Sequence, residues 1–218
     1  MQNFFKSAVV ATGLFLLSTA ASAAPISAGD TFTVTGGGAI RGGEFFITST
    51  TPGSFDDFVT FCIETAETVT MGQTYTVAAL AKQTSTGTAL SGGAAYLFTQ
   101  FAGGALDGYT QSKQNALQAA MWKFQGYDAF VIGSGVTVGS WFNASADAQA
   151  FYNLAGAQQW QQQGHTGNVF VMQNRTLAGL AQQDFLMLQP AQDVPEPATL
   201  LLLGLGAAGA VTRLRRRR

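Results

Sequence analysis

Cysteine, histidine and charged residues are scarce in this sequence. One cysteine, Cys62, and one histidine, His165, occur among 218 residues, and charged side chains make up 11% of them. A single cysteine excludes a disulfide within the chain. His165 lies in a turn-like Gln-Gly-His-Thr-Gly segment with no nucleophile pattern around it. It therefore gives little support to a catalytic triad.

The net charge of −1 is a sum over regions of unlike charge. Residues 24–193 carry eleven acidic and five basic side chains, a net of −6, whereas five arginines lie within residues 213–218. An acidic central region argues against a nucleic-acid-binding surface, so we expect no nucleic-acid partner.

The acidic side chains lack the spacings that would indicate a site. They form no pair typical of a glycosidase and no calcium-binding loop. We therefore expect no metal ion and no cofactor, and an enzyme acting on polysaccharide is the weakest of three interpretations. The carboxylates that we expect to be solvated are Asp56, Asp57, Glu64 and Glu67.

The N-terminus has the three parts of a secretory signal peptide. One basic residue within 1–6 precedes an apolar run over 8–17, and small residues follow. The run is shorter than the ~20 residues that a spanning helix needs. We expect signal peptidase to cut between Ala23 and Ala24, which makes residues 1–23 a removable signal.

The C-terminus also has three parts in a fixed order. A short motif comes first, an apolar stretch over 198–211 follows, and the arginine cluster ends the chain. The two prolines stop a helix from extending backward, and the arginines favour the cytoplasmic side. About 14 apolar residues barely cross a bilayer, which suits a transient membrane contact. The motif residues are Val194, Pro195, Glu196 and Pro197.

This tail resembles the PEP-CTERM sorting signal of Gram-negative bacteria. The resemblance implies processing by an exosortase at the inner membrane and export to the cell surface or extracellular matrix, often in association with exopolysaccharide. We therefore divide the chain into a signal peptide (1–23), an exported domain (24–193) and a sorting signal (194–218). The resemblance concerns transport and leaves the role of the exported domain open.

Turn residues divide the exported domain into strand-like and helix-like segments. Alternation of period two indicates strands, and apolar residues at helical spacing between glycines indicate helices. With no repeat or long linker, we expect one α+β domain, an antiparallel sheet, sandwich or barrel with an inserted helical layer. The predicted strands are 31–35, 44–50, 57–64, 73–81, 168–173 and 184–188, and the predicted helices are 94–102, 111–125 and 145–163.

The lone cysteine lies in one of the predicted strands. Strand alternation places Phe61 and Ile63 on one face, and Cys62 and Glu64 on the other. The more apolar face thus excludes Cys62. A free cysteine also behaves as a small hydrophobe, so an inert buried thiol is one interpretation.

Two short motifs resemble those of the bacterial surface thioester domains found in adhesins of Gram-positive bacteria. That family has an aromatic-Cys-aliphatic strand motif, here Phe61-Cys62-Ile63, and a later Thr-Gln-x-Ala-aliphatic-Trp motif. The second motif appears here as Leu117-Gln118-Ala119-Ala120-Met121-Trp122, with leucine in place of the threonine. The resemblance implies an internal thioester between Cys62 and Gln118. Its supporting residues would be Phe61, Ile63, Ala120, Met121 and Trp122.

The chemistry of a thioester explains the residue types. A cysteine thiolate attacks the carboxamide carbon of Gln118 and ammonia leaves. Trp122 follows Gln118 by one helical turn, so its ring could cover the bond. An amine on another molecule then takes the acyl group and frees Cys62. The outcome is one covalent crosslink per molecule, which we expect of a single-use adhesin and not of an enzyme.

A noncovalent interpretation also stays open. On the helix alone, Leu117, Met121 and Trp122 are typical of core packing, and Gln118 is an ordinary polar residue. The protein would then be a noncovalent structural component of an exopolysaccharide or biofilm matrix, with an inert free cysteine.

Overall fold

The computed structural model describes residues 26–39, 42–132 and 135–189. The predicted signal peptide with its Ala23/Ala24 cleavage site and the predicted sorting signal lie outside these ranges. Within them, no helix has both the length and the apolar character needed to cross a membrane.

A six-stranded antiparallel sheet forms one half of the described region. Its strands lie in the order β3-β2-β1-β4-β7-β8, and a separate hairpin pairs β5 with β6. The strands are β1 (Thr31–Ala39), β2 (Gly42–Ser49), β3 (Phe58–Thr60), β4 (Thr74–Ala81), β5 (Val131–Ile132), β6 (Val136–Thr137), β7 (Val169–Thr176) and β8 (Ala181–Leu188).

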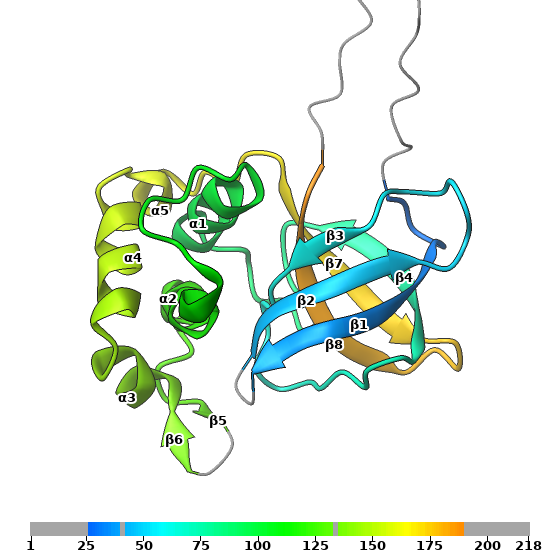
Figure 1. The fold of residues 1–218 in the computed structure, drawn as a ribbon, viewed down its shortest axis with the longest axis horizontal. Helices are drawn as coiled ribbons and strands as arrows, with labels where there is room; N and C mark the ends of the chain where they lie inside the picture. The colour runs from blue at the N-terminus through cyan, green and yellow to red at the C-terminus, as the bar shows by residue number, and fades with distance from the viewer. Residues whose placement is uncertain (1–25, 40–41, 133–134, 190–218) are drawn as a thin grey trace, which may run out of the picture.

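The two edge strands of the sheet meet, so the sheet closes into a barrel (Figure 1). The chain just after β3 pairs with β8 through a bridge between Cys62 and Phe185. Two backbone hydrogen bonds flank this bridge, from Ile63 N to Asp184 O at 3.1 Å and from Leu186 N to Phe61 O at 3.1 Å. Cys62 therefore lies in the seam that closes the barrel.

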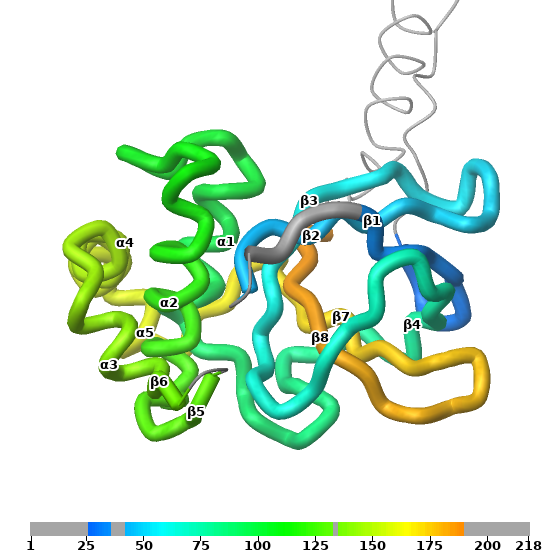
Figure 2. Tube along the Cα trace, turned by 60° about the horizontal axis from the view of Figure 1, so that its bottom comes forward, coloured from blue at the N-terminus to red at the C-terminus, as the bar shows by residue number. Residues whose placement is uncertain are grey.

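All the described α-helices occur between β4 and β7 and form a layer beside the barrel (Figures 1 and 2). Helix α2 is central, because it contacts the other main helices and also β2. The helices are α1 (Gly92–Ala102), α2 (Gln114–Phe124), α3 (Val138–Asn143), α4 (Ala146–Gly156) and α5 (Trp160–Gln163), and a 3-10 turn, η1 (Gln111–Lys113), precedes α2.

Local sequence signals explain where these helices begin. The Ser91 hydroxyl accepts a hydrogen bond from Ala94 N at 3.3 Å at the start of α1, and the Ser145 hydroxyl accepts one from Ala148 N at 3.2 Å at the start of α4. Each serine satisfies a backbone donor that has no partner inside its helix. Almost every residue of α2 from Ala116 onward is buried, because barrel and helices both pack against it.

The predicted α+β class, the antiparallel sheet and the inserted helices are confirmed. The predicted helix over 145–163 is wrong in its extent, because α4 ends at Gly156 and Gln159 adopts a left-handed backbone with φ of 61° before α5. The sequence also failed to indicate α3 and the β5–β6 hairpin. The α3 sequence Val-Gly-Ser-Trp-Phe-Asn has weak helix propensity, and tertiary packing together with the Thr137 cap stabilises it.

Candidate functional site

The seam residues around Cys62 face two different cores, as strand alternation predicts. Phe61 and Ile63 are fully buried in the apolar core shared with the helices. Cys62, 4% exposed, belongs to the core of the barrel, which it shares with Phe185 and Trp122. Both faces of the seam are thus covered, and the thiol is removed from bulk water.

Helix α2 presents Gln118 to this seam. Gln118 is 0% exposed, and its Nε2 donates a hydrogen bond to the backbone carbonyl of Cys62 at 2.8 Å. Its Oε1 accepts from the backbone N–H of Gly43, on β2, at 3.4 Å. The two residues that the sequence motifs single out, 56 positions apart, are therefore direct neighbours in the fold.

Two backbone groups determine the orientation of this carboxamide. A carbonyl faces its nitrogen and an N–H faces its oxygen, so turning the amide over would oppose donor to donor and acceptor to acceptor. The carboxamide is thus held in one orientation between β2 and the seam segment at Cys62.

Burial controls the protonation of the thiol. Desolvation, and secondarily the negative charge of Glu64, raise the pKa of Cys62 well above its ordinary value. Cys62 is consequently a neutral thiol at neutral pH, because the thiolate would have to exist without water and beside a carboxylate. Any attack by the sulfur requires that its proton leave during the reaction.

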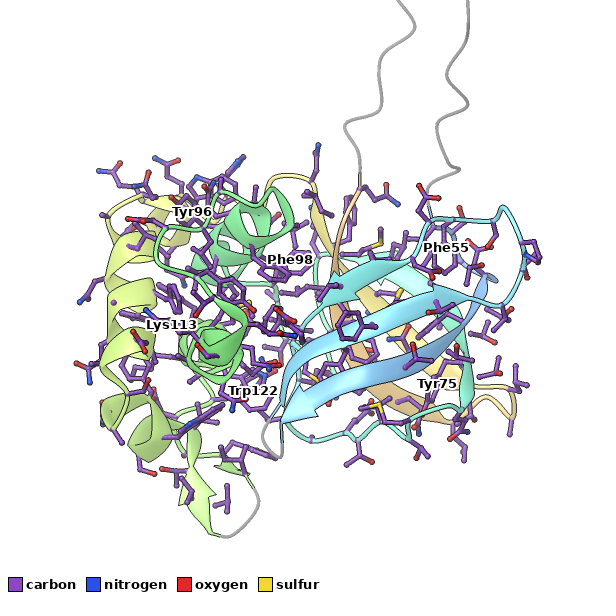
Figure 3. The ribbon with its side chains drawn as sticks, viewed as in Figure 1. Phe55, Tyr75, Tyr96, Phe98, Lys113 and Trp122 are labelled. Atoms are coloured by element: carbon purple, nitrogen blue, oxygen red, sulfur yellow. The ribbon has the colours of Figure 1, made fainter. Side chains whose placement is uncertain are left out.

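Trp122 follows Gln118 by one helical turn and belongs to the same buried core as Cys62. It lies between α2 and the barrel (Figure 3), is 4% exposed, and packs edge-to-face on Trp141 with 6.1 Å between ring centroids. Its indole Nε1 is buried, and no residue in the described ranges accepts a hydrogen bond from it. An unpaired buried donor of this kind costs about 1–3 kcal/mol.

The other motif residues of α2 are parts of the apolar core. Leu117, Ala120 and Met121 are all 0% exposed and pack in the core shared by helices and seam. Position 117, which is threonine in the thioester-domain motif, is therefore surrounded by apolar side chains in this protein. Leucine fills this space without leaving a hydroxyl to be satisfied.

The start of β2 also belongs to the site, and the sequence reasoning missed it. Gly42 and Gly43 have φ of 97° and 102°, and a Cβ on Gly42 would lie 2.8 Å from Gln118 Cγ. The adjacent Glu44 N donates to Gln114 Oε1 at 2.9 Å. The available signals were the Gly-Gly pair and the two glutamines four residues apart on one helix, but no sequence pattern relates them to each other.

Carboxylates gather next to the seam, contrary to the expectation of solvated charge. Glu64 is 1% exposed and accepts a hydrogen bond from Thr86 Oγ1 at 2.7 Å, so that expectation is wrong for Glu64. Asp184 is 0% exposed and accepts from Ser85 N at 2.6 Å. The expectation holds for Asp56 and Asp57, which are exposed, whereas Glu67 is half-buried.

Glu64, Glu67 and Asp184 each offer one oxygen, and these oxygens lie within 4.8 Å of one another. Such a group could contribute to a cation site, but Ca²⁺ takes about six to eight oxygens, so three do not make one by themselves. Their proximity has a second effect: burial, together with the charge of Glu64, raises the pKa of Asp184 to about 7.

His165 lies next to α5, where its ring packs edge-to-face on Trp160 with 4.4 Å between centroids. A cavity of about 390 Å³ lies elsewhere, lined by residues of β1, β2 and β3. Neither feature involves the Cys62–Gln118 seam.

Comparison with known proteins finds a family match for the C-terminal segment. Residues 193–218 match the family described as the PEP-CTERM protein-sorting motif. This match supports an exosortase substrate that is exported through the membrane to the cell surface or matrix in Gram-negative bacteria, with exosortase as the processing partner. No curated protein and no solved structure matches the chain.

Proposed function

We propose that this exported protein carries an internal thioester between Cys62 and Gln118 and uses it to attach covalently to amine-bearing molecules at the cell surface or in the extracellular matrix. The observation that carries the proposal is the hydrogen bond from Gln118 Nε2 to the Cys62 carbonyl at 2.8 Å. It joins the two reacting residues inside a buried seam between barrel and helices. An adhesin of this kind reacts once and is not a turnover enzyme.

Bond formation balances without any external reagent. The Cys62 sulfur bonds to the Gln118 carboxamide carbon, the carbon–nitrogen bond breaks, and the thiol proton leaves with the amide nitrogen as ammonia. Burial supports this step, because water is excluded while the carboxamide is held between fixed backbone groups. The raised pKa of Cys62 opposes it, and proximity must offset that cost.

Attachment is the second half of the reaction. An amine such as a lysine side chain attacks the thioester carbonyl, the carbon–sulfur bond breaks, and the proton from nitrogen returns to Cys62 as a thiol. The product is an amide between Gln118 and the target. The net charge of −6 on residues 24–193 supports the approach of cationic, lysine-bearing surfaces.

Intact mass spectrometry of the exported protein tests the proposal. We expect a mass one ammonia below that of the sequence between its processing sites, and addition of methylamine should raise that mass by one methylamine. Cys62→Ser should abolish both effects. Gln125→Leu is the matched control, because Gln125 is another buried glutamine adjoining α2, bound to Ser91 N at 2.6 Å, and has no contact with Cys62.

A second candidate function is a noncovalent structural component of an exopolysaccharide or biofilm matrix. The raised pKa of Cys62 favours it, because a protonated buried thiol is unreactive. In that case the protein has its full sequence mass, methylamine has no effect, and unfolding exposes one titratable thiol. This outcome would contradict the thioester.

A further inference from the structure

The backbone N–H of Gly43 points at the carbonyl oxygen on which negative charge would develop in both steps of the proposed reaction. In the amide state Gly43 N lies 3.4 Å from Gln118 Oε1, which is long for a hydrogen bond. Oxyanion donors act at about 2.7–3.1 Å from the charged oxygen. A contact that is weak before the reaction and shortens during it lowers the barrier without stabilising the starting state.

We propose that the Gly43 N–H is the oxyanion donor of this site, and that Gln114 and Tyr109 are positioning residues that hold it in place. The proposal rests on the proposed function. When sulfur adds to the Gln118 carbon, the carbonyl electron pair moves to Oε1 and Gly43 N–H stabilises it. The same donor serves again when an amine adds to the thioester and the sulfur leaves.

Helix α2 positions this donor through two glutamines one turn apart. Gln118 Oε1 accepts from Gly43 N, and Gln114 Oε1 accepts from the next N–H, that of Glu44, at 2.9 Å. Consecutive N–H groups of an extended strand normally point to opposite sides. The left-handed backbone at Gly42 and Gly43 allows both to face the same helix.

A third contact holds residue 44, at the C-terminal end of this two-residue segment. The Tyr109 hydroxyl donates a hydrogen bond to the Glu44 carboxylate. Burial, and then this hydrogen bond, raise the pKa of Tyr109, so the hydroxyl stays protonated and keeps donating. Residues 43 and 44 are thus bound to the helical layer at three points, and two of them, at Gln114 and Tyr109, involve neither Cys62 nor Gln118.

Glycine at positions 42 and 43 leaves room for the side chains of Gln118 and Gln114. A Cβ on Gly43 would lie 2.6 Å from Gln114 Oε1, so the Gln114 side chain would have to leave the position in which it accepts from Glu44 N. Glycine at these positions therefore permits the close approach that brings an N–H to the Gln118 oxygen.

Gln114→Leu in the full exported chain tests the proposal, because it removes the acceptor that positions the segment but leaves Cys62 and Gln118 unchanged. We expect methylamine to consume the thioester about tenfold more slowly, less than the 10²–10³ typical of direct loss of an oxyanion donor. We also expect the thioester carbonyl stretch to move to higher frequency. That band is identified by infrared difference against Cys62→Ala protein.

Gln161→Leu is the matched control, because Gln161 Oε1 accepts a hydrogen bond from Gly93 N at the same 2.9 Å elsewhere in the helical layer. It should lower thermal stability about as much as Gln114→Leu and leave both the rate and the carbonyl band unchanged. Tyr109→Phe keeps the ring packing against Phe101 and should slow aminolysis several-fold, which provides a second reading if Gln114→Leu fails to fold.

The results separate the two proposals. A wild-type protein with its full sequence mass overturns the thioester and this inference together. If the wild-type protein has the thioester, but Gln114→Leu and Tyr109→Phe leave its aminolysis rate and carbonyl band unchanged, only the oxyanion donor is overturned. A slower reaction with a shifted band in these variants, but not in Gln161→Leu, supports it.

Discussion

Raising the pH across the titration of Asp184 should destabilise the fold. Asp184 is 0% exposed, and burial together with the charge of Glu64 raises its pKa from 3.8 to about 7. Its oxygens accept hydrogen bonds from Ser85 N and Asn174 N, which partly compensate the charged form. The native state thus retains a proton that the unfolded chain loses at lower pH.

The sign and size of the effect follow from this difference. Below pH 3.8 both states carry the proton, and the stabilising contribution is complete. Between 3.8 and about 7 the folded state binds more protons, so the free energy of unfolding falls by about 1.4 kcal/mol per pH unit, or about 4 kcal/mol in all. Above pH 7 this contribution is lost. Glu67, whose pKa is also raised, adds to the slope in the same direction.

Urea unfolding at pH 4.5, 6 and 8 measures this slope. Asp184→Asn should flatten it, because an uncharged amide has no proton to release and any cost of its misplaced donors is constant with pH. Asp56→Asn removes the same charge from an exposed position and should keep the wild-type slope. Wild-type stability that is constant or rises from pH 4.5 to 8, or an Asp184→Asn slope equal to wild type, would refute the reasoning.

Two further substitutions examine the packing of the site. Gly42→Ala should lower the thermal midpoint more than Gly53→Ala. Both glycines have positive φ, but only at Gly42 does the new Cβ meet Gln118, at 2.8 Å from its Cγ. Calorimetry of the two variants compares their midpoints, and equal losses would argue against the close approach. Thr60→Val should cost about 1–3 kcal/mol in urea unfolding, because it removes the hydrogen bond from the Thr60 hydroxyl to the Leu186 carbonyl across the barrel seam. A Thr60→Val protein as stable as wild type would mean that this bond contributes little to closure.

Local patterns were sufficient where one element decides the outcome. Period-two alternation located most of β1, β2 and β4, and apolar spacing located α1 and α2, because each segment buries one face whatever its neighbours are. The same alternation correctly separated Cys62 from Phe61 and Ile63. Local patterns failed to predict α3, because this helix depends on contacts with other elements.

The carboxylates show where such reasoning stops. From the sequence, Glu64 is an ordinary charged residue at the end of a predicted strand. The closure of the barrel places it beside Asp184, 120 residues later in the chain. Pairing between the two edges of the sheet, the segment just after β3 and β8, is a long-range event without a local signal. The burial of Glu64 and the raised pKa of Asp184 were therefore unpredictable from spacing.

The sequence by itself determined the sorting segment, the α+β class and the identity of the two motif residues, Cys62 and Gln118. These depend on residue type and local order, which a linear pattern contains. Only the tertiary structure decided that the Gln118 carboxamide contacts the seam at Cys62, and that the N–H of Gly43 faces its oxygen. Both contacts require the barrel to close and α2 to pack against it, and burial of apolar surface from distant segments drives that assembly.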